Sequence, residues 1–211
     1  MPSLLLTTLL SLAPLISAHG LLSSPAIRTP DAATAAVCGQ TMVDFYLADN
    51  TSYPEALIRE GGLDDPDYDA ELCNLWLCKG FQFGDNAGNV AEYMPGDEVA
   101  IEVFIRIPHL GFANVSVVDT STNSVLGAPL VEWKDGYADP AVFPNLPEDQ
   151  VKFSVTVPEL DGACAEAGRC VIQWYWFGAE QTYESCIDFT QPAPDPDAVP
   201  NIRMIRGVTW W

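Results

Sequence analysis

The chain has 211 residues, of which 48% are hydrophobic, and a formal net charge of −20 at pH 7. This length predicts one domain with a sizeable core, and the charge repels phosphate backbones and anionic lipid, which excludes nucleic acid and membranes from the expected partners. A neutral polymer such as a polysaccharide is compatible with the charge, and so is the simpler interpretation that acidity keeps a secreted monomer soluble.

The first 18 residues are typical of a secretory signal peptide. An apolar run over residues 4–16 is too short to span a bilayer, and two small residues that signal peptidase accepts follow it. We therefore expect cleavage after Ala18, an extracellular location, and a mature protein that begins at His19. Sequons at Asn50 and Asn114 are candidate glycosylation sites that fit the same secreted context.

The segment from Asp31 to Cys78 is the expected place for any helix. Within it, residues 53–62 read YPEALIREGG, which predicts a short helix that ends at Gly61 and Gly62, because glycine favours helix ends. The rest of this segment is predicted to consist of long loops, and three of the cysteines lie in it.

Five later segments read as strands. They are residues 99–107, 113–119, 151–157, 170–178 and 182–190. The first reads VAIEVFIRI, with five branched aliphatic side chains on one side and Glu102 and Arg106 on the other, which is the period of a half-buried strand. Because Pro and Gly, and not periodic helices, separate these segments, we expect a two-sheet antiparallel β-sandwich.

The composition changes after Thr190. Proline recurs at positions 192, 194, 196 and 200, so residues 191–211 are predicted to form a disordered Pro/Asp-rich tail and not a core strand. The predicted organisation is therefore a signal peptide over 1–18, a β-sandwich over 19–190 and this tail.

Six cysteines make an even set in a chain predicted to enter an oxidising compartment, which favours disulfides over a structural zinc site. Two short spacings suggest local bridges, and these leave the first and last cysteines to join the two ends of the domain. The predicted pairs are Cys73–Cys78, Cys164–Cys170 and Cys38–Cys186. Spacing alone leaves other pairings open.

The chain has two histidines, and their positions suggest a metal site. If the cut follows Ala18, the α-amine and Nδ1 of His19 close a six-membered chelate ring around a metal ion. His109 follows the best predicted strand, on a loop at a sheet end, and its ring would complete a T-shaped set of three nitrogens. Such a set favours Cu(II) over zinc. The alternative is that His109 bonds a neighbour in its loop and that His19 is merely the residue after a cut.

Four motifs in this order carry a family resemblance: HG at the mature terminus, LCNLWLCKGFQF, IPHLGFANVSVVD and QTYESC. Over residues 16–190 the chain resembles the lytic polysaccharide monooxygenases, copper enzymes that oxidatively cleave crystalline polysaccharides. It is most similar to the fungal branch with a chitin-binding-type-4-like catalytic domain, the sixteenth auxiliary-activity family.

The resemblance implies an immunoglobulin-like or fibronectin-like β-sandwich that binds one copper ion. It implies that His19 binds copper through its α-amine and ring, that His109 supplies a second ring, and that Tyr183 lies in the axial position. It also implies that Gln181 orients bound oxygen species through a hydrogen bond, and that Cys186 pairs with an early cysteine, Cys38. The implied co-substrates are an external electron donor and hydrogen peroxide or dioxygen, and the implied substrate is an insoluble polysaccharide, with cellulose favoured over chitin.

Two other functions stay open: a copper-binding or transport protein of the same fold, and a non-catalytic chitin- or cellulose-binding module. The pairing of Gln181 with Tyr183 favours the enzyme, since such a pair near the metal has little purpose in chelation alone. The alternative for these two residues is a surface amide and a half-buried strand aromatic. Trp174 and Trp176 share one strand face and are interpreted as core packing, not as a sugar-binding platform.

Overall fold

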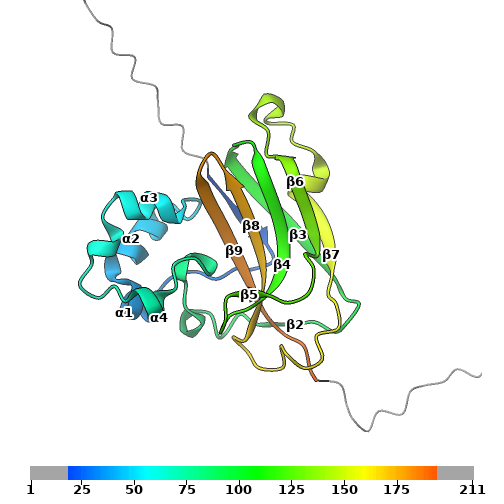
Figure 1. The fold of residues 1–211 in the computed structure, drawn as a ribbon, viewed down its shortest axis with the longest axis horizontal. Helices are drawn as coiled ribbons and strands as arrows, with labels where there is room; N and C mark the ends of the chain where they lie inside the picture. The colour runs from blue at the N-terminus through cyan, green and yellow to red at the C-terminus, as the bar shows by residue number, and fades with distance from the viewer. Residues whose placement is uncertain (1–18, 194–211) are drawn as a thin grey trace, which may run out of the picture.

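The computed structural model describes residues 19–193 (Figure 1). The predicted signal peptide lies outside the described residues, and so do residues 194–211 of the predicted tail. In the described part of the chain, no helix is long and apolar enough to cross a bilayer.

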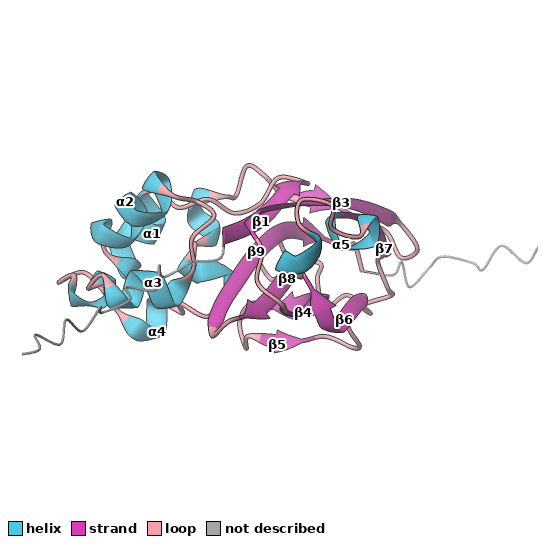
Figure 2. Ribbon diagram, turned by 90° about the horizontal axis from the view of Figure 1, so that it is seen from above, coloured by secondary structure: helices cyan, strands magenta, loops and turns pink. Residues whose placement is uncertain are grey.

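Two β-sheets form the larger part of the molecule (Figures 1 and 2). The smaller sheet has the order β1 (His19–Ser24), β3 (Glu98–Ile107) and β7 (Lys152–Thr156). The larger sheet has the order β2 (Ala91–Glu92), β9 (Gln181–Thr190), β8 (Cys170–Gly178), β4 (Gly111–Asp119) and β5 (Ser124–Val125), with β6 (Val131–Tyr137) also paired to β4. The described strands pair antiparallel, except β2 with β9. The predicted β-sandwich is confirmed.

The core lies between the sheets, where the period of two in the sequence directs the apolar side chains. In β3, Val99, Ile101, Val103 and Ile105 are buried, and the residues between them are exposed. Each such side chain contributes roughly 1.5–3 kcal/mol on full burial. They pack in one cluster with both tryptophans of β8, so the interpretation of those tryptophans as core is confirmed. All five predicted strands are present, and β8 has the predicted bounds.

Helices gather at one side of the sandwich (Figure 2). They are α1 (Ala32–Cys38), α2 (Gln40–Ala48), α3 (Pro54–Arg59) and α4 (Ala70–Cys73). The predicted helix over 53–62 is α3, which begins with proline, where the missing N–H has no helical partner to lose. A further helix, α5 (Glu148–Val151), lies outside the predicted helical segment, and it takes in Val151, which was expected in a strand. Short 3-10 helices lie at Gly62–Asp64, Cys78–Gly80, Phe83–Asp85 and Pro140–Val142.

Alternate residues of β9 attach the helical side to the larger sheet. The pairs are Thr182 with Glu55, Glu184 with the backbone N–H of Lys79, Cys186 with Cys78, and Asp188 with Arg28. The pair of Cys186 with Cys78 is a disulfide, and the other three pairs are hydrogen bonds to a carboxylate. This face of β9 is therefore both polar and buried, because the helical segment covers it.

The disulfides differ from the prediction in two of three bridges. The observed pairs are Cys38–Cys73, Cys78–Cys186 and Cys164–Cys170. The third pair is confirmed. The other two predictions are wrong, namely the local bridge from Cys73 to Cys78 and the bridge from Cys38 to Cys186, which the family resemblance also implied. The reason is that Asn74 is left-handed and ends α4, so that Cys73 stays against α1 while Cys78 reaches β9.

Gln191, the first residue of the predicted tail, packs against the sandwich. The side chain of Gln191 is fully buried, its Nε2 donates to the carbonyl of Pro158, and its Oε1 accepts from the N–H of Leu160. Its backbone N–H donates to the Cys164 carbonyl. Gln191 thus joins the end of β9 to the loop that the third disulfide closes.

Candidate functional site

Both histidines lie at one end of the sandwich. His19 is the first residue of β1 and pairs with Ile107, the last residue of β3. His109 comes two residues after Ile107, in the connection from β3 to β4. The pairing of β1 with β3 therefore brings two residues that are 90 positions apart in the sequence to the same strand end.

A bulge in β3 lies opposite His19. The pairing shifts from His19 with Ile107 to Gly20 with Ile105, so that Arg106 is an extra residue in β3. Bulges bend a strand and redirect nearby side chains. Arg106 is directed to Asp49, with its Nη2 2.8 Å from the carboxylate Oδ2.

Trp176 contacts the neighbours of both histidines. A Cβ atom at Gly20 would lie 3.2 Å from the Trp176 ring, and one at Gly178 would lie 3.1 Å from its Nε1. The Cβ atom placed at Gly178 would also lie 2.9 Å from the carbonyl oxygen of His109. These two glycines allow β1 and the His109 loop to approach one ring closely. The tryptophan that the sequence assigns to the core therefore also supports the candidate site.

Tyr183 and Gln181 lie on β9, and a hydrogen bond joins them. The Tyr183 hydroxyl donates to Oε1 of Gln181 over 2.6 Å. Tyr183 is fully buried, and its ring stacks on Trp176 with 4.4 Å between the centroids. Burial raises the pKa of the Tyr183 hydroxyl, which therefore stays a neutral donor. A buried hydroxyl thus orients the Gln181 amide. An ordinary surface amide would have no such partner.

Tyr53 packs against both His19 and Tyr183, and the sequence analysis missed it. Its ring centroid lies 6.2 Å from the His19 ring, in an edge arrangement, and 5.3 Å from the Tyr183 ring. Its hydroxyl accepts a hydrogen bond from Arg59. A tyrosine just before a helix-starting proline carries no sequence signal for such a role, because the role depends on where α3 meets β9.

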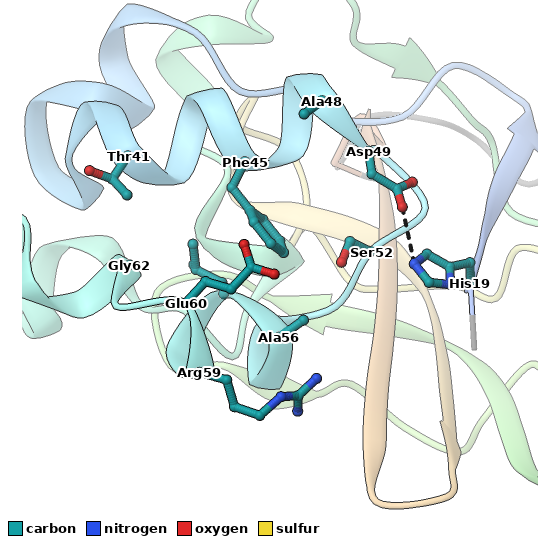
Figure 3. A pocket seen from close by; sticks show the side chains of 11 residues that line it. His19, Thr41, Phe45, Ala48, Asp49, Ser52, Ala56, Arg59, Glu60 and Gly62 are labelled. Carbon is teal, nitrogen blue, oxygen red and sulfur yellow. Dashed lines mark ion pairs between the residues drawn. The ribbon is translucent and has the colours of Figure 1, made fainter. Parts of the chain in front are cut away.

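Asp49 is the charged partner of His19, and the sequence analysis did not single it out. Its Oδ2 lies 3.0 Å from Nε2 of His19 (Figure 3), and its Oδ1 accepts from the backbone N–H and the hydroxyl of Thr51. Although partial burial opposes ionisation, these hydrogen bonds and the neighbouring His19 and Arg106 hold the pKa of the Asp49 carboxyl below its ordinary value. Asp49 is therefore an ionised acceptor at neutral pH.

A cavity of about 540 Å³ opens beside this contact, between α2 and α3 (Figure 3). His19 and Asp49 lie on its wall, Phe45 provides an apolar side, and Arg59 and Glu60 add charge. The His19 side of the candidate site is thus bordered by a hollow with both charged and apolar walls.

The donor atoms at this end of the sandwich suit copper. The rings of His19 and His109, with the α-amine that cleavage would create, are an all-nitrogen set, which Cu(II) prefers. Within residues 19–193, no group of three or more His, Cys, Asp or Glu side chains is arranged to hold a metal. With the α-amine as the third donor, the residues would fit copper in the processed chain.

No protein-family model matches the chain, and no curated protein does. Among the solved structures that match, a chitin binding domain from Burkholderia pseudomallei is 14% identical, with a TM-score of 0.43, over 82% of this chain and 99% of that chain. The cellulose-active lytic polysaccharide monooxygenase CelS2, solved in complex with copper, is 14% identical, with a TM-score of 0.40, over 82% of this chain and 98% of that chain. Likeness at this level carries no argument about function, which rests on the residues of the site.

Proposed function

We propose that the processed protein is a secreted, copper-dependent lytic polysaccharide monooxygenase that acts on an insoluble polysaccharide, with cellulose as the first candidate and chitin as the next. The observation that carries the proposal is the register of β1 with β3, which brings His19 to the strand end that His109 follows. The sequence motifs support it, and so does the hydrogen-bonded pair of Tyr183 and Gln181 at the same end of β9.

Each residue of the site has a distinct role in this proposal. His19 would hold copper with its α-amine and ring, His109 would hold it with its ring, and Tyr183 would lie beside the ion. The bound copper would supply the redox chemistry, with electrons from an external donor and hydrogen peroxide or dioxygen as the oxidant. The Tyr183 hydroxyl donates to Oε1 of Gln181 and so fixes the orientation of the amide. In this proposal the amide N–H groups donate to the bound oxygen species.

The overall change is the insertion of one oxygen atom into a C–H bond next to the glycosidic oxygen. With hydrogen peroxide, the second oxygen leaves as water. With dioxygen, two electrons and two protons from the donor complete the balance. The hydroxylated carbon then expels the neighbouring sugar, which breaks the polymer chain.

Product analysis with protein that begins at His19 tests the function. The protein is loaded with Cu(II), supplied with a reductant and peroxide, and incubated separately with cellulose and with chitin, and soluble products are identified by mass spectrometry. Oxidised oligosaccharides that vanish in His109→Ala would support the proposal and name the substrate class. A protein with one residue added before His19 is the matched control, because an amide replaces the α-amine while both rings remain. Undiminished oxidation in either variant would reject the site.

One observation favours a second function, that of a copper-binding or transport protein. In the chain that still carries residues 1–18, 8% of the His19 surface is exposed, and a buried ligand suits retention of an ion. This function predicts one-to-one copper binding and no oxidised product from either polymer. A carbohydrate-binding module predicts instead that the protein binds polymer equally with and without copper.

A further inference from the structure

The turn between α2 and α3 holds the start of β1 at two points. Oδ2 of Asp49 lies 3.0 Å from Nε2 of His19, and the Thr51 carbonyl accepts the backbone N–H of Gly20 over 3.1 Å. One contact holds the ring of the candidate ligand, and the other holds the backbone that follows it. The turn therefore sets both the position of His19 and the rotation of its ring.

Asp49 is itself fixed by donors on both of its oxygens. Oδ1 accepts from the N–H and the hydroxyl of Thr51, at 3.1 and 2.6 Å. Oδ2 faces His19 and also accepts from Arg106, whose Nη2 is 2.8 Å away. Since a carboxylate can only accept hydrogen bonds, the proton in the contact with His19 belongs to the imidazole Nε2.

A buried lysine supports the same turn from the interior. The Lys79 ammonium donates to the carbonyl of Asn50 over 3.1 Å, and the backbone N–H of Lys79 donates to Glu184 over 2.9 Å. Lys79 and Glu184 are both buried. The turn is thus anchored to β9, the strand that carries Gln181 and Tyr183.

We infer that Asp49 is a positioning residue for the metal centre, which keeps the proton of the His19 ring on Nε2 and so presents Nδ1 beside the α-amine. Nδ1 closes the six-membered chelate ring with the α-amine, whereas Nε2 lies on the far side of the imidazole. The carboxylate faces that far side, so Asp49 orients the ligand without binding an ion held at Nδ1. The inference rests on the proposed function for the identity of the metal, while the contact itself involves no metal.

The tautomer of His19 tests the inference in the metal-free protein. In nitrogen-15-labelled protein that begins at His19, a long-range proton–nitrogen correlation spectrum at about pH 8, above the ordinary imidazole pKa of about 6.5, shows which ring nitrogen is protonated. We expect Nε2–H in the wild type and a mixture with Nδ1–H in Asp49→Ala. Asp44→Ala is the matched control, since Asp44 is an exposed carboxylate of α2 that bonds Gln40. Nδ1–H in the wild type, or an unchanged tautomer in Asp49→Ala, overturns the inference.

Copper affinity gives a second readout. Loss of the outer partner of a ligating histidine typically weakens metal binding about 10–100-fold, and we expect a loss of this size in Asp49→Ala, with an altered electron paramagnetic resonance spectrum. Asp49→Asn keeps the shape of the side chain and should change both in the same direction, because each Asp49 oxygen faces a donor and an amide nitrogen cannot accept. Affinities and spectra equal to those of Asp44→Ala would reject the role of Asp49.

The two proposals fail in different ways. A wild type that binds no copper but shows Nε2–H, with a shift toward Nδ1–H in Asp49→Ala, rejects the copper function and supports the positioning of the ring by Asp49. A wild type that oxidises polysaccharide, with Asp49 variants that keep its tautomer and affinity, rejects the role of Asp49 alone.

Discussion

Tyr183 is completely buried, and its hydroxyl donates a hydrogen bond to the partly exposed amide of Gln181. Its ring packs between Trp176 and Tyr53, which fixes the hydroxyl in space. Because burial raises the pKa of that hydroxyl, it does not ionise at physiological pH and is a constant donor to Gln181. A phenyl ring would fill the same space and leave the Gln181 amide without this constraint.

Tyr183→Phe should therefore keep the fold and bind copper, while the copper spectrum changes and turnover falls. Loss of one hydrogen bond costs roughly 0.5–1.5 kcal/mol in the free energy of unfolding, a modest amount because the ring packing remains. Copper titration, electron paramagnetic resonance and denaturant unfolding measure these effects. Tyr93→Phe is the control, since Tyr93 packs on Phe189 at the other end of β9. A Tyr183→Phe spectrum identical to that of the wild type would separate this residue from the metal centre.

The strands could be predicted because every second residue of a half-buried strand faces the core and is therefore apolar. β3 alternates between buried and exposed residues along its length, and β8 begins and ends where its apolar run does. β1 and β6 escaped prediction because both depend on distant partners. β1 is a six-residue segment whose strand state comes from pairing with β3, and β6 contains Lys134, Asp135 and Gly136 where an apolar alternation would be needed.

The residues of the candidate site could be predicted only where the residue type by itself suggests a metal ligand or where a family motif contains it. His19 and His109 stand out because the chain has two histidines, and Gln181 and Tyr183 came from a family resemblance. Asp49 is one of 29 acidic residues, and its role depends on where the α2–α3 turn meets β1, which local sequence does not encode. The same reason explains the wrong disulfides, since the left-handed turn at the end of α4 sends Cys73 and Cys78 to different partners.

At the scale of a single turn, the 3-10 helix Cys78–Gly80 places a lysine out of contact with water. Burial lowers the pKa of Lys79 to about 8, although Glu184 and Asp49 oppose the shift. The unfolded chain keeps this proton up to about pH 10.4. Between these values the unfolded state binds more protons, so Lys79 makes the free energy of unfolding rise as the pH increases.

Lys79→Met should remove this rise. The variant keeps the backbone N–H that bonds Glu184 and loses the titrating ammonium together with its hydrogen bond to Asn50. Urea unfolding at about pH 8 and about pH 9.5 measures the change, and the wild type should gain stability over this interval relative to the variant. Lys134→Met, whose side chain is 80% exposed on β6, is the control and should follow the wild type. Parallel pH profiles for wild type and Lys79→Met would contradict the buried, shifted lysine.

At the scale of the whole molecule, the disulfides close loops of very different length. Cys78–Cys186 spans a sequence separation of 108 and ties the helical side to β9, whereas Cys164–Cys170 spans 6. In the loop-entropy account, a cross-link stabilises by about 4.7 kcal/mol for a loop of about 100 residues and by roughly 2 kcal/mol for a loop of a few residues. The long bridge should therefore dominate the contribution of these two to stability.

Replacing Cys78 and Cys186 by alanine should lower the free energy of unfolding by about 2–3 kcal/mol more than replacing Cys164 and Cys170. Denaturant unfolding of the two double variants under non-reducing conditions measures the difference. The short bridge serves as the matched control, because both variants lose one disulfide and gain two alanines. Equal losses would show that loop length does not govern stability in this fold.

The place of His19 at the very start of β1 links folding to maturation. β1 pairs with β3 from His19 onward, and Asp49 contacts the His19 ring. Before the proposed cleavage after Ala18, the backbone nitrogen of His19 is an amide and cannot bind copper as an amine. Proteolytic processing would then act as an on-switch, and because signal peptidase cuts on the exported side of the membrane, the complete set of donors would exist only in the secretory route and beyond it.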